Sequence, residues 1–290
     1  MYLINPAMNT FIFATDFSSN SLNALGYTLP LVKKLEGRLI LFHGFEYARP
    51  FIEAPATNLP QMNQELKIKA EEQLKIWKNM VAAQDSTLSC EYVATGGPFV
   101  KNLLKLSQKE DAEAIFMGTH GASGLKKYIM GSNTASIIEK AKCPVFAIPE
   151  GVEFSGINSI VFATDYQKEN AFILDELAKI ARLFDAKVEV LHISNDQANA
   201  DVEVYDWYKK AVKEKLSELD VSFRVFNTES VHEGINNYVK LNQTDLVVMA
   251  MHEKSWLERM LQKSKSKQQA YITEKPLLVF HHGVREKVLS

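Results

Sequence analysis

The chain has 290 residues, of which 46% are hydrophobic and 23% charged, and its formal net charge is −2 at pH 7, as is ordinary for a soluble globular protein. The near balance of charge argues against a nucleic-acid-binding protein. The sequence has neither a long apolar run nor a signal-like start, which predicts a cytoplasmic protein without a membrane contact. Cys90 and Cys143 match neither a redox pair nor a metal cluster, so we expect two buried, reduced thiols.

Short apolar runs alternate with longer amphipathic segments along the first half of the chain. The short runs predict strands near Thr10–Thr15, Arg38–Phe45, Leu88–Ala94, Ala114–Gly118 and Val145–Pro149. The longer segments predict helices near Ser19–Leu35, Gln61–Gln84, Phe99–Lys109 and Ser132–Ala141. Because strand runs such as residues 39–42 are apolar on both faces, we expect a parallel sheet covered by helices, which places a ligand at the carboxyl ends of the strands.

The second half of the sequence repeats the first. Phe11–Asp16 returns almost unchanged as Ile160–Asp165, 149 positions later, and the next apolar run keeps this offset. Later matches have an offset of 132, so the second copy is 17 residues shorter. The missing residues correspond to an irregular insertion with three prolines at Ala48–Pro60. We therefore predict two domains, residues 1–150 and 156–284, which a short linker holds together as a packed pair.

A glycine-rich loop follows the fourth predicted strand. Gly118 and Gly121 are followed, after nine intervening residues, by Gly131 and Ser132, where a helix is expected to begin. Glycines let backbone amides approach a phosphate closely, and a helix start adds unpaired amides and a positive dipole end. The spacing therefore predicts a phosphate-binding loop that differs from the P-loop and from the dinucleotide-binding motif. The alternative is a plain strand-to-helix turn in which Ser132 is an ordinary N-cap.

Two histidines and two lysines invite a functional interpretation. His43 and His192 end equivalent strands, but no Cys, His or acidic residues stand at ligand spacing around them, so we expect histidines that bond to the backbone. Lys126 and Lys127 lie in the glycine loop and could reach a terminal phosphate, whereas lysines on exposed loops are usually just solvated.

These motifs together resemble the universal stress protein family. The resemblance rests on Ala14–Ser18, His43, Met117–Gly121, the Gly131-Ser132 helix start and Cys143–Pro149. It covers the whole first copy and, more faintly, the second. It implies an α/β fold of two repeated domains, each a parallel five-stranded open sheet flanked by helices, Rossmann-like and of the adenine nucleotide alpha hydrolase type.

The resemblance also implies a nucleotide site in the first copy. The matching positions are Ala14, Thr15, Asp16, Gly44, Met117, Gly118, His120, Gly121, Gly131, Ser132 and Asn133. Adenine is expected over the ends of the first two strands, with Asp16 as the anchor of base and sugar and the backbone of Gly44 on the far side. The remaining positions line the ribose and the phosphates. Asp16 can instead cap the following helix, an alternative that applies even more to Asp165.

The second copy lacks this loop. Ala250, Glu253 and Lys263-Ser264 replace the three glycines and their following serine. Glu253 adds a side chain and a negative charge where a polyphosphate would lie, so we predict no ATP binding of the usual kind in this copy. Asp165 remains and can hold a helix start or a smaller, uncharged ligand.

The resemblance finally implies a regulatory module of the stress response that binds ATP or another adenine nucleotide, with or without Mg²⁺. It further implies that the last strands of the two copies pair within one chain, and a homodimer remains open. The alternatives are a slow ATPase or nucleotidyl-transferring enzyme and a scaffold without nucleotide. No general base, nucleophile or acidic metal pair beside the loop supports the enzyme.

Overall fold

Strands and helices alternate through the first half of the chain, as the sequence predicts. The structure, a computed structural model, describes residues 9–48, 58–119, 130–166, 173–194, 202–228, 230–251 and 274–281. The elements of the first half are β1 (Thr10–Ala14), α1 (Ser19–Lys34), β2 (Arg38–Phe45), α2 (Leu59–Gln84), β3 (Cys90–Gly96), α3 (Phe99–Lys109), β4 (Ala114–Gly118), α4 (Ser132–Lys140) and β5 (Val145–Ile148).

Helix α2 and strand β3 differ from the sequence prediction by two residues, whereas the other elements of the first half agree with it to within one residue. Helix α2 begins at Leu59 and includes Pro60, which the sequence assigns to the irregular insertion; residues 49–57 of that insertion lie outside the described residues. Proline fits there because the first turn of a helix needs no backbone N–H donor. Strand β3 begins two residues later than predicted, at Cys90, because Asp85 accepts bonds from the N–H and hydroxyl of Thr87 and so extends the preceding turn.

The second half repeats this order over the residues that the structure describes. Its elements are β6 (Ser159–Ala163), α5 (Ile173–Phe184), β7 (Lys187–Ser194), α6 (Val202–Lys215), β8 (Val221–Asn227), α7 (Val231–Leu241), β9 (Leu246–Met251) and β10 (Leu277–His281). None of the helices described in either half is both long and apolar enough to cross a membrane.

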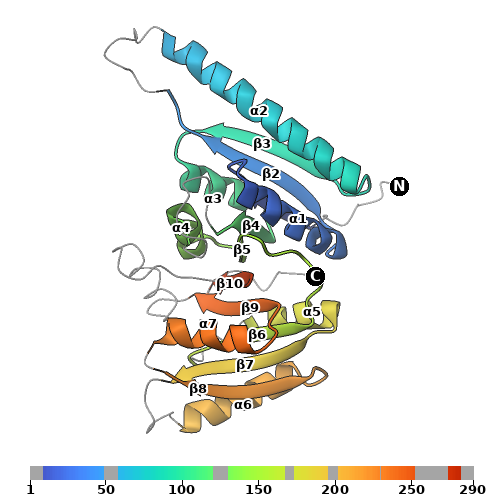
Figure 1. Ribbon diagram of the computed structural model, residues 1–290, viewed down its shortest axis with the longest axis vertical. Coiled ribbons are helices and arrows are strands. Elements are labelled where there is room, and N and C mark those ends of the chain that lie inside the picture. Colours follow the sequence, from blue (N-terminus) through green and yellow to red (C-terminus); the bar gives the residue numbers. More distant parts are fainter. Residues whose placement is uncertain are drawn as a thin grey trace.

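The strands of both halves form one sheet. Ten strands follow one another in the order β3-β2-β1-β4-β5-β10-β9-β6-β7-β8, which runs along the long axis of the molecule in Figure 1. Neighbours within each half are parallel, whereas β5 and β10 are antiparallel, with Leu277 opposite Ala147 and Val279 opposite Val145. The last strands of the two copies therefore pair within one chain, as expected.

Helices cover both faces of the sheet. Alternate residues of β1 point to opposite faces: Phe11 and Phe13 pack with α1 and α2, whereas Ile12 and Ala14 pack with α3 and α4. Each of the two apolar clusters continues across the β5–β10 pair into the second half. The two halves therefore share one continuous core on each face of the sheet, as parallel strands with two buried faces require.

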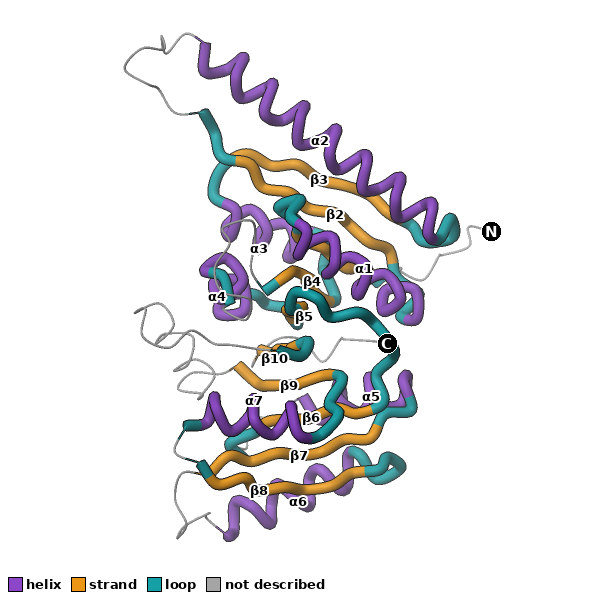
Figure 2. The backbone as a smooth tube through the Cα atoms, in the orientation of Figure 1, coloured by secondary structure: helices purple, strands orange, loops and turns teal. Residues whose placement is uncertain are grey.

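The connection between the halves lies against α1. Residues 149–158 form a loop that runs along the boundary of the two halves in Figure 2. The Asn23 side chain of α1 donates to the carbonyl of Val152 (2.7 Å) and accepts a bond from the N–H of Gly151. Tyr27 of α1 meets Phe154 edge to face. The linker is therefore fixed to the first half rather than free.

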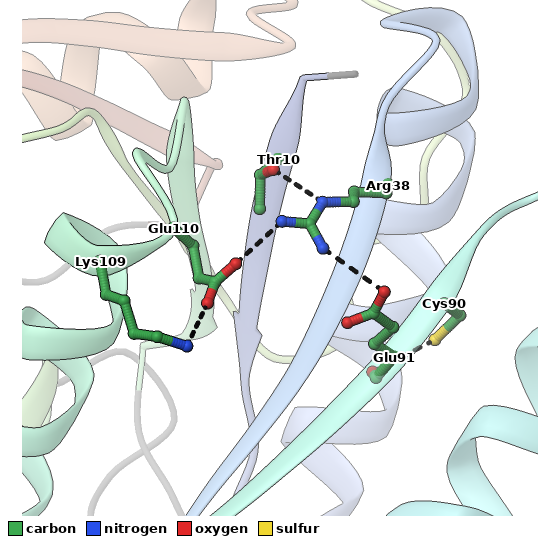
Figure 3. Close-up of polar contacts among 6 residues, drawn as sticks. All are labelled: Thr10, Arg38, Cys90, Glu91, Lys109 and Glu110. Carbon is green, nitrogen blue, oxygen red and sulfur yellow. Dashed lines mark hydrogen bonds and ion pairs between the residues drawn. The ribbon is translucent and has the colours of Figure 1, made fainter. Parts of the chain in front are cut away.

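A charged network ties together the amino ends of the first strands (Figure 3). The Arg38 guanidinium donates to Thr10 Oγ1 (2.9 Å), to Glu110 Oε2 (2.9 Å) and, at 3.4 Å, to Glu91 Oε1. Lys109 adds a bond to Glu110 (2.8 Å), and hydrogen bonds from Lys109 and Arg38 lower the pKa of Glu110. This network lies at the opposite edge of the sheet from the predicted ligand site and fastens β1, β2, β3 and the end of α3.

Candidate functional site

The predicted site lies where the strand order reverses. Strand β1 sits between β2 and β4, so the chain leaves the carboxyl ends of these neighbours in different directions, which is where α/β sheets bind ligands. Ala14 is level with Met117 of β4 on one side and with Phe42 of β2 on the other. Ala14 and Met117, far apart in the sequence, are thus brought together at this edge, and both side chains are buried.

Thr15 and Asp16 extend the end of β1. The Thr15 N–H donates to the Phe42 carbonyl (2.9 Å), so Thr15 is buried and held against β2, whereas Asp16 is exposed. Asp16 Oδ1 accepts from the Ser18 N–H (3.1 Å), the Ser18 hydroxyl (2.6 Å) and the Ser21 hydroxyl (2.6 Å). Ser18 in turn caps α1 by accepting from the Ser21 N–H. The N-cap of α1 is therefore Ser18 rather than Asp16, and Asp16 supports the helix start through its bonds to Ser18 and Ser21.

His43 is a structural histidine. Its Nδ1 lies 2.8 Å from the Thr15 carbonyl oxygen, and a carbonyl only accepts, so Nδ1 carries the hydrogen. Burial lowers the pKa of His43, which favours the neutral ring. Phe17, whose φ of 63° is left-handed, lays its ring on His43 with centroids 4.3 Å apart. No group of three His, Cys, Asp or Glu residues that could hold a metal occurs in the described part of the chain.

The second half repeats this arrangement. His192 Nδ1 lies 2.9 Å from the Thr164 carbonyl oxygen, and Tyr166, with φ of 58°, stacks on His192 at 4.4 Å. Both histidines therefore bond to the backbone, as predicted. The left-handed aromatic residue was not predicted from the sequence, although an aromatic residue follows Thr-Asp in both copies.

Gly44 has a packing reason that is independent of any ligand. A Cβ at Gly44 would lie 3.0 Å from the Phe99 ring and 3.5 Å from the Phe99 Cα, at the start of α3. In the second half Ile193 takes the strand position of Gly44, and a Cβ on Gly234 of α7 would lie 2.5 Å from the Thr228 side chain and 3.0 Å from the Ile193 side chain. Close packing between a strand and the following helix therefore requires a glycine in each half, at a different position.

The two ends of the glycine loop are held together. The Gly131 N–H donates to the Thr119 carbonyl (2.6 Å), and the buried Thr134 hydroxyl donates to the Gly118 carbonyl (2.9 Å). The Thr119 N–H reaches the Ile148 carbonyl of β5 (3.0 Å). The start of α4 is therefore fixed beside the end of β4. His120 and Gly121 of the predicted site lie outside the described residues, as do Lys126 and Lys127.

The start of α4 has an open first turn. Gly131 is its N-cap in an extended conformation (φ −66°, ψ 154°), and no side chain among the described residues caps the helix. The first intrahelical bond runs from the Ala135 N–H to the Gly131 carbonyl (2.9 Å). Ser132 and Asn133 are exposed, and Ser132 is the first helical residue rather than the N-cap that the turn alternative required. An uncapped helix start of this kind attracts anions.

The second half differs at the matching edge. Ala250 of β9 takes the place of Gly118 and is buried. Glu253, Lys263 and Ser264 lie outside the described residues, so the predicted loss of the phosphate loop in this half rests on the sequence.

Comparison with known proteins agrees with the fold and the motifs. The sequence profile of the universal stress protein family matches residues 8–149 and again residues 156–281. A universal stress protein of Methanocaldococcus jannaschii is 27% identical over 138 residues, which make up 47% of this chain and 79% of the relative. Another, of Mycobacterium tuberculosis, is 31% identical over 124 residues, or 42% of this chain and 45% of the relative.

A solved structure matches both halves at once. The crystal structure of a universal stress protein from Archaeoglobus fulgidus superposes on 95% of this chain and 97% of its own, with a TM-score of 0.72 and 21% sequence identity, which shows a shared fold. Two matches of the profile in sequence order, together with this superposition, account for nearly the whole chain. The chain belongs to the universal stress protein family and carries two copies of its domain.

Proposed function

We propose that the first half binds ATP or a related adenine nucleotide and that the protein is a cytoplasmic regulatory module of the stress response. The observation that carries this proposal is the start of α4, which no side chain of the described residues caps and which the Gly131–Thr119 and Thr134–Gly118 bonds hold beside the end of β4. A fixed group of backbone amides with a positive dipole end is suited to phosphate oxygens.

Each predicted contact has a role in this proposal. The phosphates lie at Gly131, Ser132 and Asn133, with Gly118, His120 and Gly121 completing the loop. The base lies over Ala14 and Thr15, with the backbone of Gly44 on its far side, and the buried Met117 lies beside the ribose and phosphates. A nucleotide at Asp16 shares this carboxylate with Ser18 and Ser21, whose hydroxyl bonds can rearrange around a ribose or an adenine amino group.

Magnesium would reach this site with the nucleotide. The described residues contain no group of three His, Cys, Asp or Glu side chains that could hold a metal without help. Mg²⁺ commonly keeps several waters and binds through substrate phosphates, so a MgATP complex fits a site built from backbone amides.

The domain division is part of the proposal. Residues 1–150 form the nucleotide-binding domain, and residues 156–284 form a domain that no longer binds ATP in the usual way. The second half contributes instead to the shared sheet through β10. One nucleotide per chain is the stoichiometry that follows.

The first test is to denature freshly purified protein and identify the released small molecules by chromatography and mass spectrometry. The second is a calorimetric titration with MgATP of folded protein from which bound nucleotide has been removed. We expect about one adenine nucleotide per chain. Gly131→Glu should abolish binding and Asp16→Ala should weaken it, whereas the matched control Asp165→Ala in the second half should leave binding unchanged. Absence of both a released nucleotide and a titration signal would refute the proposal.

A further inference from the structure

Helix α4 is held at both ends, and the groups that hold its two ends come from different halves of the molecule. Its amino end begins at Gly131, in the proposed phosphate site. Its carboxyl end meets His281, the last residue of β10 in the second half, whose Nε2 contacts the Ile138 carbonyl oxygen. The His281 side chain is only 6% exposed, so this contact is buried at the junction of the halves.

The chemistry of a helix end explains the contact. The last four carbonyl groups of a helix have no intrahelical donor. The Ala141 N–H donates to the Ile137 carbonyl (2.8 Å), and α4 ends at Lys140, so the Ile138 carbonyl needs a donor from outside the helix. The His281 imidazole provides it from Nε2, while its Nδ1 has no partner among the described residues. A side chain of the second half thus caps a helix of the first.

Apolar packing strengthens this link. Ile137 and Ile138 of α4 belong to the same buried cluster as Leu277 and Val279 of β10, with all four side chains fully buried. Helix α4 has nine residues and is therefore about 13 Å long, short enough to move as a rigid unit. A shift at its carboxyl end moves the amides at its amino end.

We propose that His281 is a positioning residue through which the second half sets the nucleotide affinity of the first. The inference rests on the proposed nucleotide function. Strand β10 and His281 hold α4 in the position where the backbone amides of its first turn can bind a phosphate. By thermodynamic reciprocity, a bound nucleotide strengthens the contact between α4 and β10 by the same factor. The second half, without an ATP site of its own, thereby acts as a regulatory surface for the first.

The experiment uses the full chain and three substitutions. His281→Leu fills the space without a donor, whereas His281→Gln places an amide N–H where Nε2 lies. His192→Leu is the matched control, because His192 is also a strand-end histidine of the second half, and its bond among the described residues is to Thr164 of its own half. MgATP affinity is measured by calorimetry, and amide hydrogen exchange of α4 is measured with and without MgATP.

We expect His281→Leu to weaken MgATP binding about five- to tenfold, at the lower end of measured coupling between sites, and to speed amide exchange along α4. His281→Gln should restore both, and His192→Leu should change neither. Wild-type MgATP affinity in the His281→Leu protein would overturn this inference but not the proposed function. Equal losses of affinity in His281→Leu and His281→Gln would do the same, and so would an equal loss in the His192→Leu control. A wild-type chain that binds no MgATP would instead remove the proposed function, and this inference with it.

Discussion

The Thr134 hydroxyl provides a direct test of how α4 is fixed beside β4. Thr134 is 3% exposed, and its Oγ1 donates to the Gly118 carbonyl over 2.9 Å. In Thr134→Val, a methyl group of nearly the same shape replaces the hydroxyl, so the carbonyl loses a donor while packing is retained. Leaving a buried acceptor without its donor costs about 1–3 kcal/mol. We expect a loss of about 1–2 kcal/mol in the free energy of unfolding, because a carbonyl has a second lone pair that can remain bonded.

The assay compares Thr134→Val with Thr134→Ser by urea unfolding and by MgATP titration. Ser keeps the hydroxyl and loses only a methyl group, so it should retain most of the nucleotide affinity, although it costs some packing energy. Val should lose affinity as well as stability, because the end of β4 and the start of α4 are no longer bonded. Equal affinity in the Val and wild-type proteins would refute the reasoning, and so would a Ser variant that binds MgATP as poorly as the Val variant.

Three further predictions concern other parts of the molecule. Arg38→Met should lower the free energy of unfolding by about 1–2 kcal/mol in urea, since it removes charge-assisted bonds from the amino ends of the strands, yet MgATP affinity should not change. Burial lowers the pKa of His281 below its unfolded value near 6.5, so the folded state binds fewer protons and stability should fall as the pH drops below that value, by at most about 1.4 kcal/mol per pH unit. The free energy of unfolding, measured at pH 7.5 and 5.5, should show this dependence on pH, and the dependence should be smaller in His281→Gln. The pH dependence that remains in this variant is assigned to other groups such as His43, whose pKa is also lowered. Phe17→Ala should destabilise the protein, because the ring packs on both His43 and Trp77, and circular dichroism melting would detect the change.

The sequence predicted the fold well because its signals are local and repeated. Runs such as Leu39–Phe42 are apolar on both faces, which only a covered parallel strand requires, and a second copy confirms the reading of the first. The predicted start of α2 was wrong because proline usually indicates irregular structure, whereas Pro60 lies in the first turn of the helix, which tolerates proline. Strand β3 begins later than predicted because the Asp85 side chain bonds to the Thr87 N–H and forms a turn, which the hydrophobic periodicity of the sequence does not reveal.

The sequence indicated the residue types of the candidate site but not the bonds between them. Glycine spacing indicated the loop, yet nothing in the spacing shows that Thr134 reaches back to Gly118, because that bond joins residues 16 positions apart across the loop. The sequence allowed Asp16 as the cap of α1, whereas in the structure Ser18 is the N-cap and Asp16 bonds to Ser18 and Ser21. The sequence gives no sign of the contact between His281 and Ile138, since the two residues are 143 positions apart and belong to different copies.

The two copies separate what the fold needs from what a ligand needs. A histidine bonded to a Thr carbonyl and covered by a left-handed aromatic residue occurs in both halves, so this arrangement serves the strand end whether or not nucleotide binds. The close contacts of Gly44 with Phe99 and of Gly234 with Thr228 and Ile193 likewise have a packing reason that needs no ligand. The Gly-x2-Gly-x9-Gly-Ser spacing is different, because the second copy keeps the adjoining strand but none of its glycines. Selection for packing alone would not distinguish the copies in this way, whereas a phosphate bound in one half would.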